Sequence, residues 1–136
     1  MRKLALALLV LGATALAAQD RPTFETLDLV VESGDRPLGA YQVELTGGAV
    51  VGLEGGESKA WAEAPYYDPA ALEGGRLIVA AFTLDASAPA GKIRVARIHV
   101  MGNKDAKYEV KLMAAAAAGG DRTHPKVELV RHGGDK

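Results

Sequence analysis

The chain has 136 residues, of which 49% are hydrophobic, with 16 basic and 17 acidic side chains and no cysteine. A nearly balanced charge without clustered Lys and Arg excludes the electrostatic surface that nucleic acids and anionic membranes require. The lack of cysteine excludes disulfides, cysteine zinc sites, a thiol nucleophile and a lipid-anchored cysteine, so packing alone must stabilise the fold.

Residues 1–17 have the three parts of a secretory signal peptide. Arg2 and Lys3 precede an apolar run over residues 4–11, and an Ala-Leu-Ala sequence at residues 15–17 is typical of a cleavage site. The apolar run is too short to span a bilayer. We therefore expect cleavage near Ala17, a mature net charge of −3 from 14 basic and 17 acidic residues, no membrane span in the mature chain, and a periplasmic or secreted protein.

From Phe24 to Arg131 apolar residues recur with a period of two, and clusters of Gly, Pro and Asp separate the segments. This pattern is typical of an all-β protein. The expected strands cover residues 26–32, 41–46, 49–53, 77–84, 92–101, 108–112 and 126–130. Strands at this spacing, without a βαβ rhythm, predict an antiparallel β-sandwich of about seven strands, with a jelly-roll order as one option.

Three of these segments carry more specific expectations. Residues 77–84 are apolar on both faces, which favours a central strand covered on both sides. The phase of the alternation changes within residues 92–101, which predicts a β-bulge near Val95-Ala96 and leaves Arg94 and Arg97 in solvent. Five alanines at residues 114–118 are too few for a stable helix and precede two glycines, so a strand end and a loop are expected there.

The alternation stops between residues 57 and 75, and we call this segment the aromatic loop. Asp68 followed by Pro69 predicts an N-cap and one short helical turn. Trp61, Tyr66 and Tyr67 are three of the seven aromatic residues of the chain. Such rings can form a binding surface for a sugar or a protein, or they can cover an end of the sandwich core. The sequence leaves both interpretations open.

Catalytic and metal-binding patterns are not found in the sequence. The histidines His99, His124 and His132 have no second histidine or carboxylate at ligand spacing on one strand face, so we assign no metal. The serines lie in turns without a G-x-S-x-G motif. Carboxylates gather around the aromatic loop, but a solvated loop explains them as well as a glycosidase site does. We expect no enzyme activity and no cofactor.

Several segments resemble cohesin domains. Residues 30–34 and 38–45 resemble the first strand end and the glycine-led second strand of that family, the Y-D-P-x-x-L sequence at residues 67–72 resembles a cohesin turn, and residues 91–96 resemble a later strand. The similarity spans most of residues 26–130. Two features differ from the cohesin pattern. In cohesins the Y-D-P turn usually follows the second strand closely, whereas in this chain a third strand and a loop precede it, and the chain is shorter than a full cohesin. The resemblance implies a jelly-roll sandwich related to carbohydrate-binding modules, acting through a surface and not through catalysis.

Together these patterns predict a signal peptide over residues 1–17, a cohesin-like β-sandwich domain over residues 18–131 and a disordered tail over residues 132–136. The expected function is that of an exported, non-catalytic protein-binding or assembly module with a protein partner on the cell surface or in the periplasm. The alternative is a carbohydrate-binding module that holds a polysaccharide with Trp61, Tyr66 and Tyr67.

Overall fold

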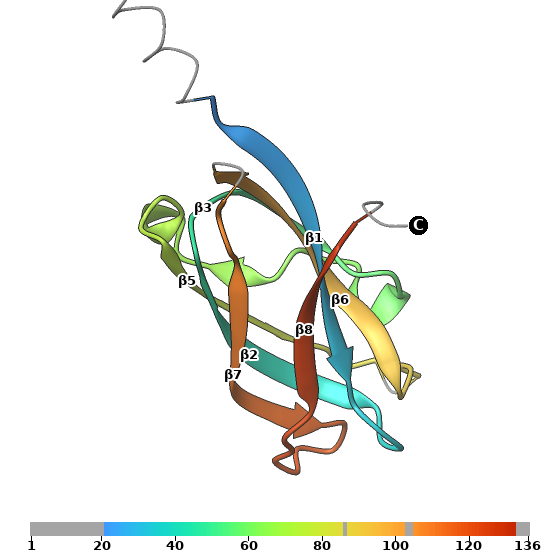
Figure 1. Cartoon of the computed structure of the whole chain (residues 1–136). Coiled ribbons are helices and arrows are strands. Elements are labelled where there is room, and N and C mark those ends of the chain that lie inside the picture. The colour runs from blue at the N-terminus through green and yellow to red at the C-terminus, as the bar shows by residue number, and fades with distance from the viewer. Residues whose placement is uncertain (1–20, 86, 103–104, 133–136) are drawn as a thin grey trace, which may run out of the picture.

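The computed structural model describes residues 21–85, 87–102 and 105–132, and this part of the chain forms two four-stranded antiparallel sheets (Figure 1). The strands are β1 (Thr23–Glu32), β2 (Leu38–Thr46), β3 (Ala49–Gly55), β4 (Tyr66–Tyr67), β5 (Arg76–Phe82), β6 (Lys92–Gly102), β7 (Glu109–Ala117) and β8 (Lys126–Arg131). Two short 3₁₀ turns, η1 (Lys59–Trp61) and η2 (Pro69–Ala71), lie in the aromatic loop. The predicted signal peptide lies outside the described residues, as does the predicted tail apart from His132.

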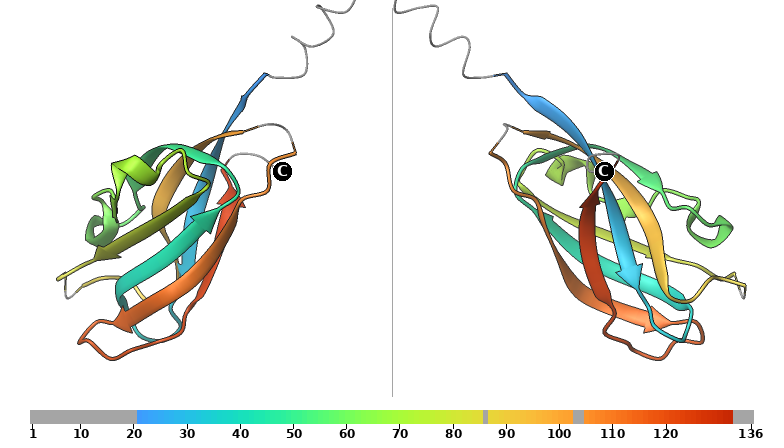
Figure 2. Two further views of the ribbon diagram at one scale, coloured as in Figure 1. Left: turned by 90° about the vertical axis from the view of Figure 1, so that its left-hand side faces the viewer. Right: turned by 45° about the vertical axis from the view of Figure 1, so that its right-hand side comes forward.

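The two sheets pack face to face as the layers of a sandwich (Figure 2). The first sheet has the strand order β3-β6-β1-β8, and the second sheet has the order β4-β5-β2-β7. Every pairing is antiparallel. The predicted antiparallel β-sandwich is therefore confirmed, with the two-residue strand β4 in addition to the seven expected strands. None of the described helical segments has the length and apolar character needed to cross a membrane.

The core forms where the alternating strands of the two sheets face each other. In β1 the residues Leu27, Leu29 and Val31 are buried, and in β2 the same is true of Tyr41, Val43 and Leu45. Their polar neighbours along each strand point outward, because successive side chains of a strand lie on opposite faces. The predicted faces of both strands are confirmed.

The predicted bulge in β6 is confirmed. Leu29 pairs with Ala96 and Val30 pairs with Arg94, so Val95 is the additional residue opposite β1. Both Val95 and Ala96 are buried, which is why the alternation changes phase at this point. The expectation that Arg94 and Arg97 extend into solvent is wrong, because both side chains lie within 4.0 Å of Asp28 on β1.

Two further expectations are corrected by the second sheet. The strand ends within the alanine run as expected, but it continues through Ala117 before the loop begins, because the backbone of residues 114–117 pairs with β2 from Gln42 to Leu38. The apolar segment at residues 77–84 is covered on one face only. The strand ends at Phe82, and the side chains of Phe82 and Leu84 are exposed on the outside of the sandwich. The outer face of this sheet is therefore apolar and open around Phe82, whereas its other end carries the Arg76–Glu44 ion pair.

Candidate functional site

The structure separates the three aromatic residues of the aromatic loop. Trp61 is 2% exposed and lies in the core, with its ring centroid 5.5 Å from that of Tyr41. Tyr67 is partly buried and packs against the core, whereas Tyr66 is 66% exposed. The three rings do not form one continuous platform, and Tyr66 alone among them is available to a large ligand.

The chain segment around these rings is held by local capping. The Asp68 carboxylate accepts a hydrogen bond of 3.0 Å from the backbone N–H of Ala70, and Pro69 takes the first position of η2. The predicted N-cap and helical turn are confirmed, as a 3₁₀ turn. The preceding strand β4 pairs with β5, with Tyr66 opposite Ala80. This pairing places the Tyr66 ring at the edge of the outer face of the second sheet.

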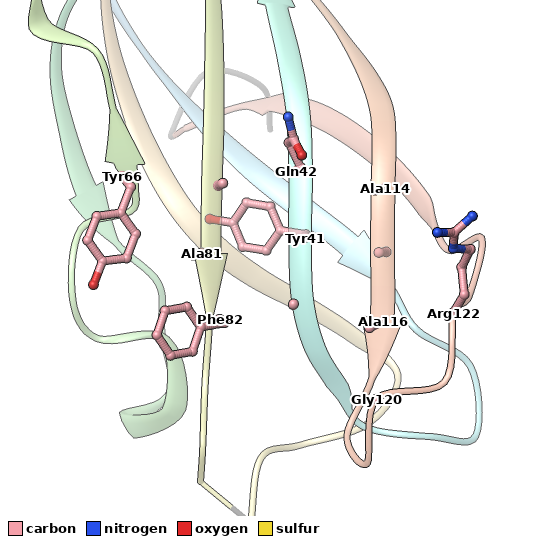
Figure 3. A pocket seen from close by; sticks show the side chains of 12 residues that line it. Tyr41, Gln42, Tyr66, Ala81, Phe82, Ala114, Ala116, Gly120 and Arg122 are labelled. Atoms are coloured by element: carbon pink, nitrogen blue, oxygen red, sulfur yellow. The ribbon is translucent and has the colours of Figure 1, made fainter.

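A shallow hollow crosses this outer face, and we call it the alanine groove. Its volume is about 460 Å³. The strand register explains its floor, because residues directly opposite each other in adjacent strands share one face. Gln42 of β2 lies opposite Ala80 of β5 and Ala114 of β7, and Ala40 lies opposite Phe82 and Ala116. Small methyl groups on three neighbouring strands leave room above the sheet (Figure 3).

The two sides of the alanine groove differ in chemistry. On one side the rings of Tyr66 and Phe82 lie almost parallel, with an interplanar angle of 11° and centroids 6.2 Å apart. Arg122 lies on the other side, beyond β7 (Figure 3), where an isolated bridge to Ala116 holds its backbone. Phe82 and Arg122 are thus separated by three strand spacings of about 4.8 Å each. The aromatic pair and the cation lie on opposite sides of an apolar floor.

A second group of polar side chains lies on the outer face of the first sheet. Asp28 on β1 accepts a hydrogen bond of 3.0 Å from Arg97 on β6 and lies 3.2 Å from the His132 ring. Burial raises the pKa of the Asp28 carboxyl, but hydrogen bonds and charges from Arg97 and His132 outweigh it and leave the pKa below 3.8. His99 on β6 bridges Thr26 and Glu54.

The Asp28–Arg97 pair gives a testable contribution to stability. The Arg97→Gln variant should lower the free energy of unfolding by about 1–2 kcal/mol in urea denaturation at pH 7, because it leaves a largely buried carboxylate without its main partner. The Arg36→Gln variant is the matched control, since the Arg36–Asp121 pair is more than half exposed, and it should cost less than about 0.5 kcal/mol. Equal effects of the two variants would contradict this account.

The contribution of the same pair to stability depends on pH, and the direction of the Asp28 pKa shift determines how. Because the pKa of Asp28 is lowered in the folded state, its contribution is present above the unfolded value near 3.8 and is lost as the pH falls through the folded value. The Asp28→Asn variant should lack this loss on the acid side.

The sequence did not indicate the alanine groove, nor did it indicate the polar contacts around Asp28 and around His99. Phe82, Arg122 and the floor alanines come from separate segments, and only the register of β2, β5 and β7 brings them together. Similarly, Glu54 reaches His99 from a neighbouring strand 45 residues earlier. No group of three or more His, Cys, Asp or Glu side chains suited to a metal occurs in the described part of the chain.

Comparison of the chain with protein-family models, with curated proteins and with solved structures found no match. The fold and the alanine groove define an antiparallel β-sandwich with an open apolar face, and the residues on that face are the basis for the proposal that follows.

Proposed function

We propose that this chain is an exported, non-catalytic protein-binding or assembly module of cohesin-like type, and that it binds its partner through the alanine groove. The observation that carries this proposal is the apolar part of the outer face of the second sheet at the alanine groove, where Tyr66 and Phe82 remain 66% and 58% exposed. Exposed aromatic rings beside a flat apolar floor are typical of protein interaction sites, because they bury a large area with little loss of side-chain entropy.

The lining of the alanine groove also supports a binding role over a catalytic one. It contains no carboxylate and no imidazole that could act as a general acid or base. The polar groups available in the lining are the side chains of Gln42 and Arg122 and the hydroxyl of Tyr66, since the Tyr41 hydroxyl is buried in the core. A partner that fits this surface has an apolar ridge over the alanines and an acidic group facing Arg122.

The proposed cohesin-like class rests on the sequence segments that resemble cohesins and is supported by the two-sheet antiparallel sandwich that such a resemblance implies. The proposed export rests on the signal-peptide pattern at residues 1–17. Intact-mass measurement of the protein recovered from the periplasm or medium tests export directly. Recovery of a full-length cytoplasmic product would contradict it.

The Phe82→Asp variant tests the binding surface. The tagged mature chain serves as bait for the exported proteins of its own cells, and the recovered partner is then titrated against purified variants by calorimetry. Phe82→Asp should weaken binding at least about tenfold, because it places a charge within the apolar face and opposes an acidic partner.

The control for this variant is Val130→Asp, which changes an exposed valine on β8, in the other sheet. It should bind like the wild type. Equal binding by all three proteins would show that the partner does not use the alanine groove, and the absence of any exported partner would contradict the proposed function itself.

A carbohydrate-binding module is the alternative, and the nearly parallel rings of Tyr66 and Phe82 are the observation that favours it. Because Trp61 is buried, a sugar would stack on Tyr66 and Phe82 and not on the platform expected from the sequence. Retention of the wild type on a glycan array, lost in a stably folded Tyr66→Ala variant, would favour this alternative over a protein partner.

A further inference from the structure

The outer face of the second sheet carries complementary groups at equal distances on either side of β2. Tyr66 on β4 lies two strands from β2 in one direction, and Arg122, which bridges to Ala116 on β7, lies two strand positions from β2 in the other. Phe82 on β5 and Ala116 on β7 both lie one strand from β2, opposite Ala40. An aromatic pair on one side therefore has a methyl surface and a cation at the same distances on the other.

A twofold axis along β2 exchanges these two sides when a second copy lies face to face on the alanine groove. The axis keeps each residue at its level along the strands and reverses its side, as in an isologous contact. Phe82 of one copy then lies on Ala116 of the other, and Tyr66 of one copy lies beside Arg122 of the other. Each contact occurs twice, and each joins groups that attract one another, a ring with methyl groups and a ring with a guanidinium.

Arg122 is available for this contact. Its side chain is exposed, and it takes part in no ion pair with any other residue that the structure describes. From the level of Ala116 the side chain extends toward the level of Ala114 (Figure 3). Tyr66 lies at this same level, because Tyr66, Ala80, Gln42 and Ala114 form one row across the sheet. The guanidinium can therefore reach the ring of a second copy.

The polar group at the centre of the alanine groove can pair with its own copy. Gln42 lies on β2, and so on the axis, between Ala80 and Ala114. A carboxamide both donates and accepts hydrogen bonds, so two Gln42 side chains can satisfy each other. Within one chain the Gln42 Nε2 atom lies 3.8 Å from the Met113 sulfur, which is a weak acceptor. An apolar partner would bury this amide without a strong hydrogen bond, which favours a second copy as the occupant.

The charged end of the same face is compatible with this arrangement. Arg76 on β5 and Glu109 on β7 lie opposite Thr46, so the axis brings Arg76 of one copy to Glu109 of the other. Glu44 lies on the axis and faces its own copy. Each Glu44 carboxylate, however, accepts a hydrogen bond of 2.7 Å from Arg76 and lies opposite Lys111, so two cations offset the like charges.

We propose that two copies of this chain form a symmetric dimer through the alanine groove, with the twofold axis along β2. The dimer uses the surface named in the proposed function, but it needs no exported partner. Dimer and partner therefore compete for the groove, and the dimer covers Tyr66 and Phe82 until a partner replaces the second copy.

Sedimentation equilibrium of the purified mature chain, with no other protein present, tests the dimer. The mean mass should rise with concentration from that of one chain to that of two. Arg122→Glu should raise the dimer dissociation constant at least about tenfold, because it removes two ring–cation contacts and places a carboxylate beside each Tyr66. Lys126→Glu is the matched control, since it makes the same change of charge at an exposed position of β8 in the other sheet, and it should dimerise like the wild type.

The Gln42→Cys variant tests the position of the axis. The natural chain has no cysteine, so a bismaleimide with a short spacer can join only the introduced thiols. Two copies of Gln42→Cys should be cross-linked efficiently, because residue 42 lies beside its own copy in the dimer. Val130→Cys, at an exposed position of β8, should give little cross-linked product at the same concentration. Adding Arg122→Glu to Gln42→Cys should lower the yield.

Three results would overturn the dimer. They are a wild-type chain that stays monomeric up to about 1 mM, equal dissociation constants of Arg122→Glu and Lys126→Glu, and equal cross-linking of the two cysteine variants. Each differs from a failure of the proposed function. A monomer that still captures an exported protein would refute the dimer alone, whereas a dimer that captures none would contradict only the proposed function.

Discussion

The Leu29→Asp and Val43→Asp variants should each fail to form the folded domain. Both side chains are 0% exposed, and they come from the central region of the two facing sheets. An unpaired carboxylate in this interior costs several kcal/mol in addition to the lost packing, which is comparable with the whole stability of a domain of this size. Far-UV circular dichroism and size-exclusion chromatography should show unfolded or aggregated protein.

Val51→Asp is the control for this pair of variants. Val51 lies in a strand of the same sandwich, but it is 49% exposed at the irregularity of β3. A charge at this position remains hydrated, so the variant should fold with a stability within about 0.5 kcal/mol of the wild type. If Leu29→Asp or Val43→Asp folded as well as Val51→Asp, the assignment of the inner faces would be wrong.

The Trp61→Ala variant should lose about 3–5 kcal/mol of unfolding free energy, because the indole fills the core beside Tyr41 and its removal leaves a cavity. Burial also raises the pKa of the Tyr41 hydroxyl, which agrees with the dry surroundings of both rings. Urea denaturation measures the loss, and binding of a hydrophobic dye should increase as apolar surface becomes exposed.

Tyr66→Ala is the matched control in the same loop. Its ring is 66% exposed, so the substitution should cost less than about 1 kcal/mol. A stable Trp61→Ala protein would mean that the ring does not support the core. The opposite responses of these two aromatic residues distinguish the part of the aromatic loop that stabilises the fold from the part available for binding.

Local patterns predicted those features that depend on neighbours in sequence. The period of two identified the buried faces of β1 and β2, and the change of phase identified the bulge at Val95, because both follow from the alternation of side chains along one strand. The N-cap at Asp68 was predictable for the same reason, since its hydrogen bond reaches only two residues along the chain.

The candidate site could not be predicted in this way, because its geometry depends on strand order and register. Nothing near Arg97 in the sequence indicates that Asp28 is its partner, since the two are 69 residues apart. The aromatic loop shows the same limit, because its composition could not indicate that Trp61 points inward and Tyr66 outward. The alanines of β7 acquire their place in the groove only through their pairing with β2.

The strand order also determines the sequence in which the strands can pair during folding. Among the described strands, the only neighbours in sequence that pair are β4 and β5, and they share two residue pairs. No hairpin of useful length can therefore form early, and β1 must wait for β6 and β8, the last of the described strands. Such distant pairings have a high loop-closure cost, so we infer cooperative folding on a millisecond-to-second scale. The first sheet can therefore close only after β8 has been made, because β8 pairs with β1.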